Sequence, residues 1–259
     1  MLFDDLIEEF VTSLENQLGT VLTKDTAAQV LTLSSQDPIF TIHLYFPNRP
    51  VTRLENRTPK TFHIDIDQLA TAPKKTLLRL LTLLGKGQVI YARQTVVARI
   101  DKKVALDFQI DHHLQLALAG KYRYGLFSDG ELISIAVFSG GRHMRDKKAS
   151  YRSFELLRFC HKSGVRVVGG LSKLTSAFIK SFKPNDIMTY VDRDWARVSN
   201  LHTIGFRERG QTLPQQFWIA SGHRHHAPNE VSLAELQNSF PDGYLIYNSG
   251  STKLILELP

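Results

Sequence analysis

Hydrophobic residues near the start of the chain recur every three or four positions, and this spacing predicts one amphipathic helix over residues 2–18. Apolar and polar residues then alternate in FTIHLYF (40–46) and FHIDIDQL (62–69), which predicts two strands separated by a turn-rich segment. The segment KKTLLRLLTLLGKG (74–87) predicts a second helix that ends at its glycines. Residues 1–88 are therefore expected to form a small α+β unit.

Strands predominate in the rest of the chain, residues 89–259, which we expect to form a second domain. Residues 104–118 predict a helix, and RVVGGLSKL (166–174) predicts a strand, a glycine turn and the start of another helix. The remaining segments are strand-like, and the predicted strands and hairpins are VIYARQTVVARI (89–100), a hairpin over 121–140 that turns at Ser128-Asp129-Gly130, ELLRFC (155–160), DIMTYV (186–191), QQFWIA (215–220) and a closing hairpin over 244–258. The expected fold class is α/β, with the segregated character of an α+β protein.

Composition bounds the class of protein. The chain has 259 residues, 42% of them hydrophobic and 22% charged, which is enough to bury a sizeable core. The single cysteine, Cys160, excludes an internal disulfide and is expected to pack in the core, and no CxxC or HExxH pattern predicts a metal site. The first residues are acidic, unlike a signal peptide, and no apolar run approaches about 18 residues. We therefore expect a soluble, cytoplasmic protein without a membrane partner.

The net charge of +7 is concentrated in the middle of the chain. Residues 121–180 hold 12 lysines and arginines but only 4 acidic residues. Such a positive field attracts the phosphates of a nucleotide cofactor or of a nucleic acid. A solvated lysine-rich surface is the alternative explanation.

The segment ELLRFCHKSGVRVVGGLSKLTSAFIK (155–180) resembles the cofactor-binding core of the GNAT superfamily of N-acetyltransferases. In that family a strand leads into a loop of the form Arg/Gln-x-x-Gly-x-Gly/Ala and then a helix. Arg166, Gly169 and Leu171 fall on these positions, with Leu171 departing from the expected small residue. Backbone N–H groups at such a helix start, helped by the helix dipole, hold a pyrophosphate, to which Ser172 and Lys173 add a hydroxyl and a charge.

This resemblance implies a mixed, mostly antiparallel sheet flanked by helices, and an acyl-coenzyme A or a related nucleotide-bearing donor. The residues expected to bind that donor are Arg166, Gly169, Gly170, Leu171, Ser172 and Lys173. The alternative explanation of VRVVGG is a buried strand with glycines for close packing.

The order of further motifs is similar to a narrower group within that superfamily. The group includes the C-terminal domains of some phage homing endonucleases, uncharacterised bacterial proteins and, more distantly, the phage DNA-modification protein Mom. The shared motifs are His113-Leu114-Gln115, a Gly-Leu-Phe strand (125–127), Arg142, the strand 155–159, Gly-Gly-x-Ser-Lys (169–173), Tyr-x-Asp-x-x-Trp within DIMTYVDRDW (186–195) and YNSGSTKL (247–254). Outside this group, LHTIGF (201–206) resembles the general GNAT ending Tyr-x-x-Leu-Gly-Phe. Together with the basic middle of the chain, which attracts nucleic acid, the resemblance to this group leads us to expect an acceptor that is a base or amine in DNA or RNA.

Two departures from the family pattern affect the expected chemistry. Leu201 stands where the family usually has a tyrosine, which in many members protonates the departing thiolate. The glycine-containing turn that usually follows the tryptophan is also missing after Trp195. An acetyl transfer by this chain therefore needs another proton donor.

Three residues are candidates for catalysis. Asp192 follows an apolar strand and is placed to take a proton from an amine, although an ion pair with a neighbouring arginine or lysine explains it equally well. Arg158 is a candidate contact for substrate or phosphate. His113 is selected by the family match, against the alternative of a hydrogen-bonded core histidine. The residues expected to contact nucleic acid are Arg142, Arg145, Lys147, Lys148 and Trp195.

Two other polar clusters are weaker candidates. Asp65 and Asp67 are expected on one face of a strand, where an exposed polar surface explains them better than a bound cation does. The run HRHH (223–226) is expected in an exposed loop, and we do not predict a metal site there.

Three functional hypotheses remain open from the sequence. The first is a GNAT-like acyltransferase that acts on nucleic acid or an amine. The second is a nucleic-acid-binding module with a degenerate transferase fold, which the leucine at 201 favours. The third and least favoured takes Gly169-Gly170 as the glycine turn of an S-adenosylmethionine-dependent methyltransferase.

Overall fold

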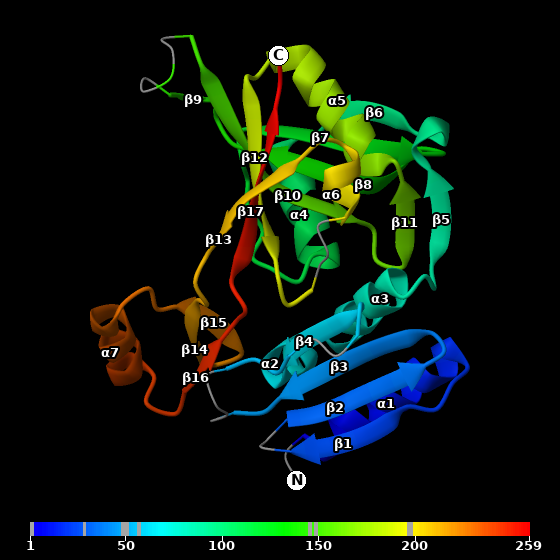
Figure 1. Cartoon of the computed structure of the whole chain (residues 1–259), viewed down its shortest axis with the longest axis vertical. Helices are drawn as coiled ribbons and strands as arrows, with labels where there is room; N and C mark the ends of the chain where they lie inside the picture. Colours follow the sequence, from blue (N-terminus) through cyan, green and yellow to red (C-terminus); the bar gives the residue numbers. More distant parts are fainter. Residues whose placement is uncertain are drawn as a thin grey trace. The chain divides into compact units, whose positions relative to one another are not determined.

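The computed structural model describes residues 3–27, 30–47, 52–55, 58–144, 147, 150–195 and 199–259. The chain divides into two compact units (Figure 1). Unit 1 consists of Met1–Leu77, Asp192–Arg197 and Gln211–Thr252, and unit 2 of Leu78–Val191, Val198–Gly210 and Lys253–Pro259. The sequence suggests one boundary near residue 88, whereas the contacts divide the chain at residue 77 and assign two later segments to the first unit.

The N-terminal part of unit 1 is a four-stranded sheet in the order β1-β2-β3-β4. β2 pairs antiparallel with β1 and β3, and β4 lies parallel to β3. The predicted first helix is confirmed, and its apolar face, including Phe10 and Leu14, is buried. The elements are α1 (Asp4–Leu18), β1 (Thr23–Ala27), β2 (Val30–Gln36), β3 (Ile39–Tyr45), β4 (Thr61–Asp65), α2 (Ile66–Thr71) and α3 (Pro73–Leu83), the last of which runs across the boundary.

The prediction for Asp65 and Asp67 is wrong. β4 ends at Asp65, and the chain turns there into α2, so the two aspartates do not share a strand. Both are also buried, with exposed fractions of 1% and 7%. A buried carboxylate requires compensating charge or hydrogen bonds, so both aspartates must have polar partners inside the protein.

A second sheet in unit 1 has the order β15-β14-β16. The HRHH run is strand β15 rather than the expected loop, because it pairs antiparallel with β14. The expected C-terminal hairpin is also wrong, since β16 pairs with β14 whereas β17 joins another sheet. The elements are β14 (Gln216–Ala220), β15 (His223–His226), α7 (Glu230–Ser239) and β16 (Tyr244–Tyr247).

Unit 2 is built on an eight-stranded sheet in the order β13-β17-β12-β10-β8-β7-β6, with β9 paired to β10. Its described pairings are antiparallel except for β10 with β12. The elements are β5 (Gln88–Tyr91), η1 (Ala92–Gln94), β6 (Val96–Arg99), α4 (Lys102–His112), β7 (Tyr122–Ser128), β8 (Glu131–Phe138), β9 (Arg142–His143), β10 (Arg152–His161), β11 (Val165–Val168), α5 (Gly170–Phe182), β12 (Asp186–Asp192), α6 (Ser199–Thr203), β13 (Arg207–Gln211) and β17 (Ser251–Glu257). The predicted fold class, a mixed and mostly antiparallel sheet flanked by helices, is confirmed.

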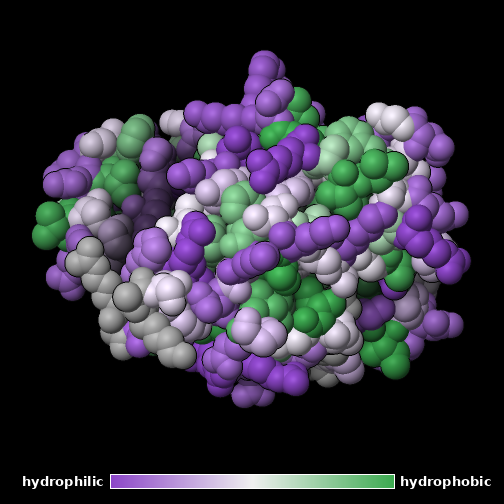
Figure 2. Space-filling view, turned by 90° about the horizontal axis from the view of Figure 1, so that it is seen from above, coloured by the Kyte–Doolittle hydropathy of each residue, from purple (hydrophilic) through white to green (hydrophobic). Residues whose placement is uncertain are grey.

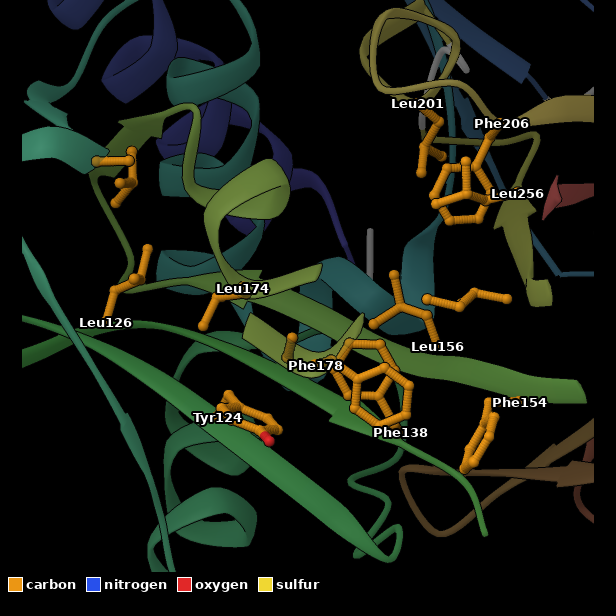
Figure 3. Close-up of a cluster of buried hydrophobic side chains, with 14 of the residues drawn as sticks. Tyr124, Leu126, Phe138, Phe154, Leu156, Leu174, Phe178, Leu201, Phe206 and Leu256 are labelled. Atoms are coloured by element: carbon orange, nitrogen blue, oxygen red, sulfur yellow. The ribbon is translucent and has the colours of Figure 1, made fainter. Parts of the chain in front are cut away.

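Successive side chains of β8 point to opposite faces of this sheet, and each face carries a hydrophobic cluster. Ala136 and Phe138 join the cluster that contains Phe178 of α5, whereas Ile135 and Val137 join the cluster that contains Phe108 of α4. Phe138 and Phe178 stack with ring centroids 3.9 Å apart (Figure 3). Cys160 lies in the α4 cluster, as its predicted packing role requires.

A mostly antiparallel sheet disfavours the methyltransferase hypothesis, which places the glycine turn in a doubly wound parallel sheet. Within the described residues, no helix is long and apolar enough to cross a membrane.

Candidate functional site

The pairing between β10 and β12 stops partway along the two strands. The parallel ladder runs from Ser153 with Asp186 to Leu156 with Thr189. At its end the Thr189 hydroxyl donates a hydrogen bond to the Leu156 carbonyl at 2.9 Å. The register of β10 against β8 shifts between Leu156 and Arg158, as expected of a bulge that bends a strand. β10 then continues to His161 and β12 to Asp192, so a gap opens in the hydrogen bonding of the sheet.

Helix α5 begins with backbone N–H groups that no side chain caps. Gly169 is its N-cap residue, with φ of 77°, and no side chain caps the helix. The first bond runs from Lys173 N to Gly169 O. The N–H groups of the three residues before Lys173 therefore have no acceptor within the helix. The left-handed φ explains the first glycine of the pair.

The second glycine, Gly170, is explained by packing. A Cβ atom at this position would lie 3.1 Å from Val167 Cβ and 3.3 Å from His161 Cε1. The same distances place the start of α5 beside the end of β10, where β12 has left the ladder. The gap in the sheet and the uncapped helix start are thus adjacent in unit 2.

The other residues expected to bind a donor differ in where their polar groups are directed. Arg166 is exposed on β11, and Ser172 is exposed in the first turn of α5. Leu171 is partly buried and packs on the hydrophobic cluster of unit 2. The Lys173 ammonium donates to the carbonyl oxygens of Ala92, at 2.7 Å, and Thr95. Lys173 therefore holds η1 against α5 rather than presenting its charge to a phosphate.

His161 lies at this site, and the sequence did not single it out. Its Nδ1 is 2.9 Å from Ser134 Oγ, whose hydroxyl donates to Cys160 O at 3.0 Å. Because the serine proton is used in that bond, Nδ1 is the donor to Ser134 and Nε2 is unprotonated. Burial, with smaller effects of Arg79 and Arg166, lowers the pKa of His161 to about 4. The only sequence signal was its position directly after a predicted strand.

The side chains of Arg158 and His113 form hydrogen bonds with backbone groups of the chain. Arg158 donates to Leu116 O through Nε and Nη2, at 3.2 and 3.0 Å, and to Leu157 O through Nη1 at 2.8 Å. It therefore joins the β10 bulge to the segment after α4. His113 is the C-cap residue of α4, and its Nδ1 accepts from Gln115 N at 3.1 Å.

Asp192 ends β12 and begins a buried polar network in unit 1. Its Oδ1 accepts a hydrogen bond from Asp194 N at 2.9 Å. The Asp194 carboxylate accepts from Arg53 at 2.8 Å and from the Ser249 hydroxyl. Burial raises the pKa of Asp194 to about 6, opposed by Arg53 and reinforced by Asp192.

The network continues to the two aspartates of β4 and α2. Arg53 binds Asp65 through two hydrogen bonds of 2.8 and 3.0 Å. Arg224 binds Asp67 at 2.6 and 2.8 Å and Asp65 at 3.2 Å. Burial raises the pKa of Asp67, although Arg224 opposes the shift. Arginines from two distant parts of the sequence thus neutralise these carboxylates.

Three of the five predicted nucleic-acid contacts, Arg142, Lys147 and Trp195, lie within the described residues. Arg142 is exposed in β9, and Lys147 donates to Tyr151 Oη at 3.1 Å. Trp195 is 4% exposed and packs with its ring centroid 6.3 Å from that of Phe62. This burial makes Trp195 a core residue and disfavours its predicted contact with nucleic acid. Arg145 and Lys148 lie outside the described residues.

Two further features bear on the chemistry: the side chain at position 201 and the arrangement of metal-ligating residues. Leu201 is 9% exposed and belongs to the hydrophobic cluster of unit 2, together with Phe206 and Leu256 (Figure 3). It therefore places no hydroxyl in that region. Among the described residues, no group of three or more histidine, cysteine or acidic side chains is arranged to hold a metal ion.

No protein-family model and no curated protein sequence matches the chain. Similar solved structures include an IAA acetyltransferase from Bacillus cereus, with 18% identity and a TM-score of 0.38 over 63% of this chain and 99% of the other. A GNAT family acetyltransferase from Elizabethkingia anophelis with acetyl-CoA bound has 11% identity and a TM-score of 0.36, over 64% and 99% of the two chains. The ribosomal-protein-S18-alanine N-acetyltransferase from Escherichia coli has 11% identity and a TM-score of 0.40, over 63% and 93%. Because these sequence identities and TM-scores are low, a functional conclusion must come from the geometry of this chain.

Proposed function

We propose that unit 2 is an acyl-CoA-dependent transferase domain of the GNAT type. The observation that carries the proposal is the end of the β10–β12 ladder beside the uncapped start of α5. A gap between two strands that lies next to unpaired backbone donors suits a ligand with a long arm and a pyrophosphate. Acyl-CoA has that form, and it supplies an acyl group activated as a thioester.

The residues at the helix start fit the charge of such a donor. The N–H groups of Gly170, Leu171 and Ser172 and the positive end of the helix dipole would face the pyrophosphate. Residues 162–180 contain four lysines and arginines and no acidic residue. His161 is neutral above about pH 4, so it adds no charge of its own to the site at neutral pH.

The transfer also requires a base and an acid. The acceptor amine would attack the thioester carbonyl, forming a C–N bond and breaking the C–S bond, while its proton passes to a base and the thiolate receives another proton. Asp192 is our candidate base, because it is the last residue of β12 and directly follows Val191, which belongs to unit 2. Tyr190 is our candidate acid in place of the tyrosine absent at 201, because it is 44% exposed at the first β12 position after the ladder ends.

A pair of variants on one helix tests the donor site. Ser172→Glu places a negative charge where the pyrophosphate would lie, but acidic residues stabilise the first turn of a helix. Ser176→Glu places the same charge on an exposed position one turn later. By isothermal titration with acetyl-CoA, the first variant should bind at least about 10-fold more weakly than wild type without a lower melting temperature. Equal affinities in both variants, or no binding by wild type, would refute the proposal.

We also propose that the acceptor is a base or amine in nucleic acid. This proposal rests on the concentration of positive charge over residues 121–180. Binding of a short DNA duplex should weaken steeply as salt rises, because each phosphate contact releases counterions. Arg142→Gln should reduce the salt slope. Salt-dependent DNA binding without acetyl-CoA binding would instead favour the hypothesis of a binding module with a degenerate transferase fold.

A further inference from the structure

The two-stranded ribbon formed by β5 and β11 exposes one of its faces. The strands are parallel, with Arg166 opposite Val89 and Val168 opposite Tyr91, so these four side chains share a face. Val89 is 47% exposed, Tyr91 46% and Val168 37%. Val165 and Val167, which alternate with them, are buried in the hydrophobic cluster. Figure 2 shows the molecule from above, and the hydrophobic side chains exposed in that view form separate patches between hydrophilic ones.

This exposed face leads directly to the proposed donor site. β11 ends one residue before Gly169, and β5 continues into η1, next to α5 (Figure 1). A Cβ atom on Gly169 would lie 3.5 Å from Ala92 Cβ, and Lys173 bonds Ala92 O at 2.7 Å. The ribbon and the first turn of α5 are therefore fixed to each other.

The chemistry of the face suits a nucleoside phosphate. The Arg93 guanidinium lies over the Tyr91 ring, 5.0 Å from its centroid, and Arg166 is exposed on the same face as Tyr91. Residues 86–100 contain three lysines and arginines and no acidic residue, like the segment 162–180. An aromatic ring stacks on a base, and guanidinium groups bind phosphate oxygens in a bidentate manner. One tyrosine and two valines offer too small an apolar area for a stable protein interface.

We propose that this face binds the nucleoside bisphosphate end of the acyl donor, with Tyr91 against the base and Arg93 and Arg166 toward the phosphates. The inference rests on the proposed function, because a pyrophosphate at the start of α5 would bring the attached nucleoside to the adjoining ribbon. It adds Tyr91 and Arg93 to the residues that select the donor.

Three probes separate the two parts of the donor site. Acetyl-CoA contains both the nucleoside and the acyl-bearing arm, acetyl-phosphopantetheine lacks the nucleoside, and adenosine 3′,5′-bisphosphate lacks the arm. Tyr91→Ser and Arg93→Gln should each weaken binding of acetyl-CoA and of the bisphosphate by about 5- to 100-fold. Binding of acetyl-phosphopantetheine should not change. Tyr91→Phe, which keeps the ring, should retain nearly full affinity for all three.

Arg207→Gln is the matched control, because Arg207 is exposed on β13, at the opposite end of the strand order from β6. It should leave all three affinities unchanged, and the melting temperature of every variant checks its folding. If acetyl-CoA binds wild type and both ribbon variants equally, the inference is wrong and the proposed function stands. If wild type does not bind acetyl-CoA, both fail. If the ribbon variants lose single-stranded DNA binding but keep acetyl-CoA, the face binds nucleic acid and the inference is overturned.

Discussion

The hydroxyl of Thr189 donates a hydrogen bond to the carbonyl of Leu156, 33 residues earlier, and the parallel ladder between their strands ends at this pair. A ladder carbonyl at the end of a parallel pair loses its backbone donor when the next residue of the partner strand diverges. The Thr189 side chain replaces that donor inside the core, since Thr189 is 5% exposed and Leu156 4%. The strands can therefore separate without leaving a buried carbonyl unpaired.

Thr189→Val should destabilise the protein by about 1–3 kcal/mol, because the valine keeps the shape of the side chain but leaves the Leu156 carbonyl without this donor. Thr189→Ser keeps the hydroxyl and serves as the control. Urea unfolding monitored by circular dichroism measures both. Equal stability of the valine variant and wild type would show that the hydroxyl does not end the ladder as described.

Asp192→Asn should lower the rate of acyl transfer from acetyl-CoA to a DNA acceptor by roughly 10²–10⁴-fold, as for a lost general base. The amide oxygen can still accept the bond from Asp194 N, so the melting temperature and acetyl-CoA affinity should stay near wild type. A joint loss of stability and donor binding would make Asp192 a structural residue. Full activity in the folded variant would remove it from the site.

The buried carboxyl of Asp194 should make stability depend on pH. Its pKa is raised from 3.8 to about 6, so the folded protein binds this proton more tightly than the unfolded chain. The stabilisation is fully present below about pH 3.8 and is lost as pH rises through about 6. The loss is at most about 3 kcal/mol, the equivalent of the shift in pKa.

Comparison with Asp194→Asn removes the Asp194 titration, while the titrating groups outside its network are the same in both proteins. Between pH 4 and 7, about the span of the Asp194 titration, the stability of wild type relative to the variant should fall. Unfolding free energies at several pH values measure the difference. Two parallel curves would mean that Asp194 does not titrate in this range.

His161 should remain neutral until about pH 4, with the proton on Nδ1. Its pKa lies below the usual 6.5, so its contribution to stability is present above pH 6.5 and is lost as pH falls toward 4. Nitrogen-15 spectra of the histidine rings, assigned with His161→Gln, report the pKa and the tautomer directly. Titration near pH 6.5 would contradict the buried, serine-bonded geometry.

The elements of unit 2 were largely predictable from periodicity, whereas the network of unit 1 was not. The Ser-Asp-Gly hairpin and the strand–glycine–helix order of 166–174 are local signals, and both occur where the sequence places them. Arg53 and Arg224 lie 12 and 159 residues from Asp65, and no local pattern reports pairing over such separations. The same reason explains why Asp65 was expected on an exposed face.

The donor-site residues show a similar division. Gly169 was identified by its motif and has the left-handed φ that favours glycine. Lys173 occurs in the same motif, but its ammonium is used by carbonyls of residues 92 and 95. Only tertiary structure decides whether a lysine beside a helix start faces a ligand or its own chain.

Hydrogen–deuterium exchange with and without acetyl-CoA tests the location of the donor most directly. Amides that have no partner within the helix exchange readily, and a bound pyrophosphate would accept their hydrogen bonds. We predict slower exchange over residues 169–173 and at residues 190–191, where β12 has left the ladder, and no change over the exposed strand 23–27. Unchanged exchange over residues 169–173 at saturating acetyl-CoA, or protection confined to another part of the chain, would contradict a donor site at the start of α5.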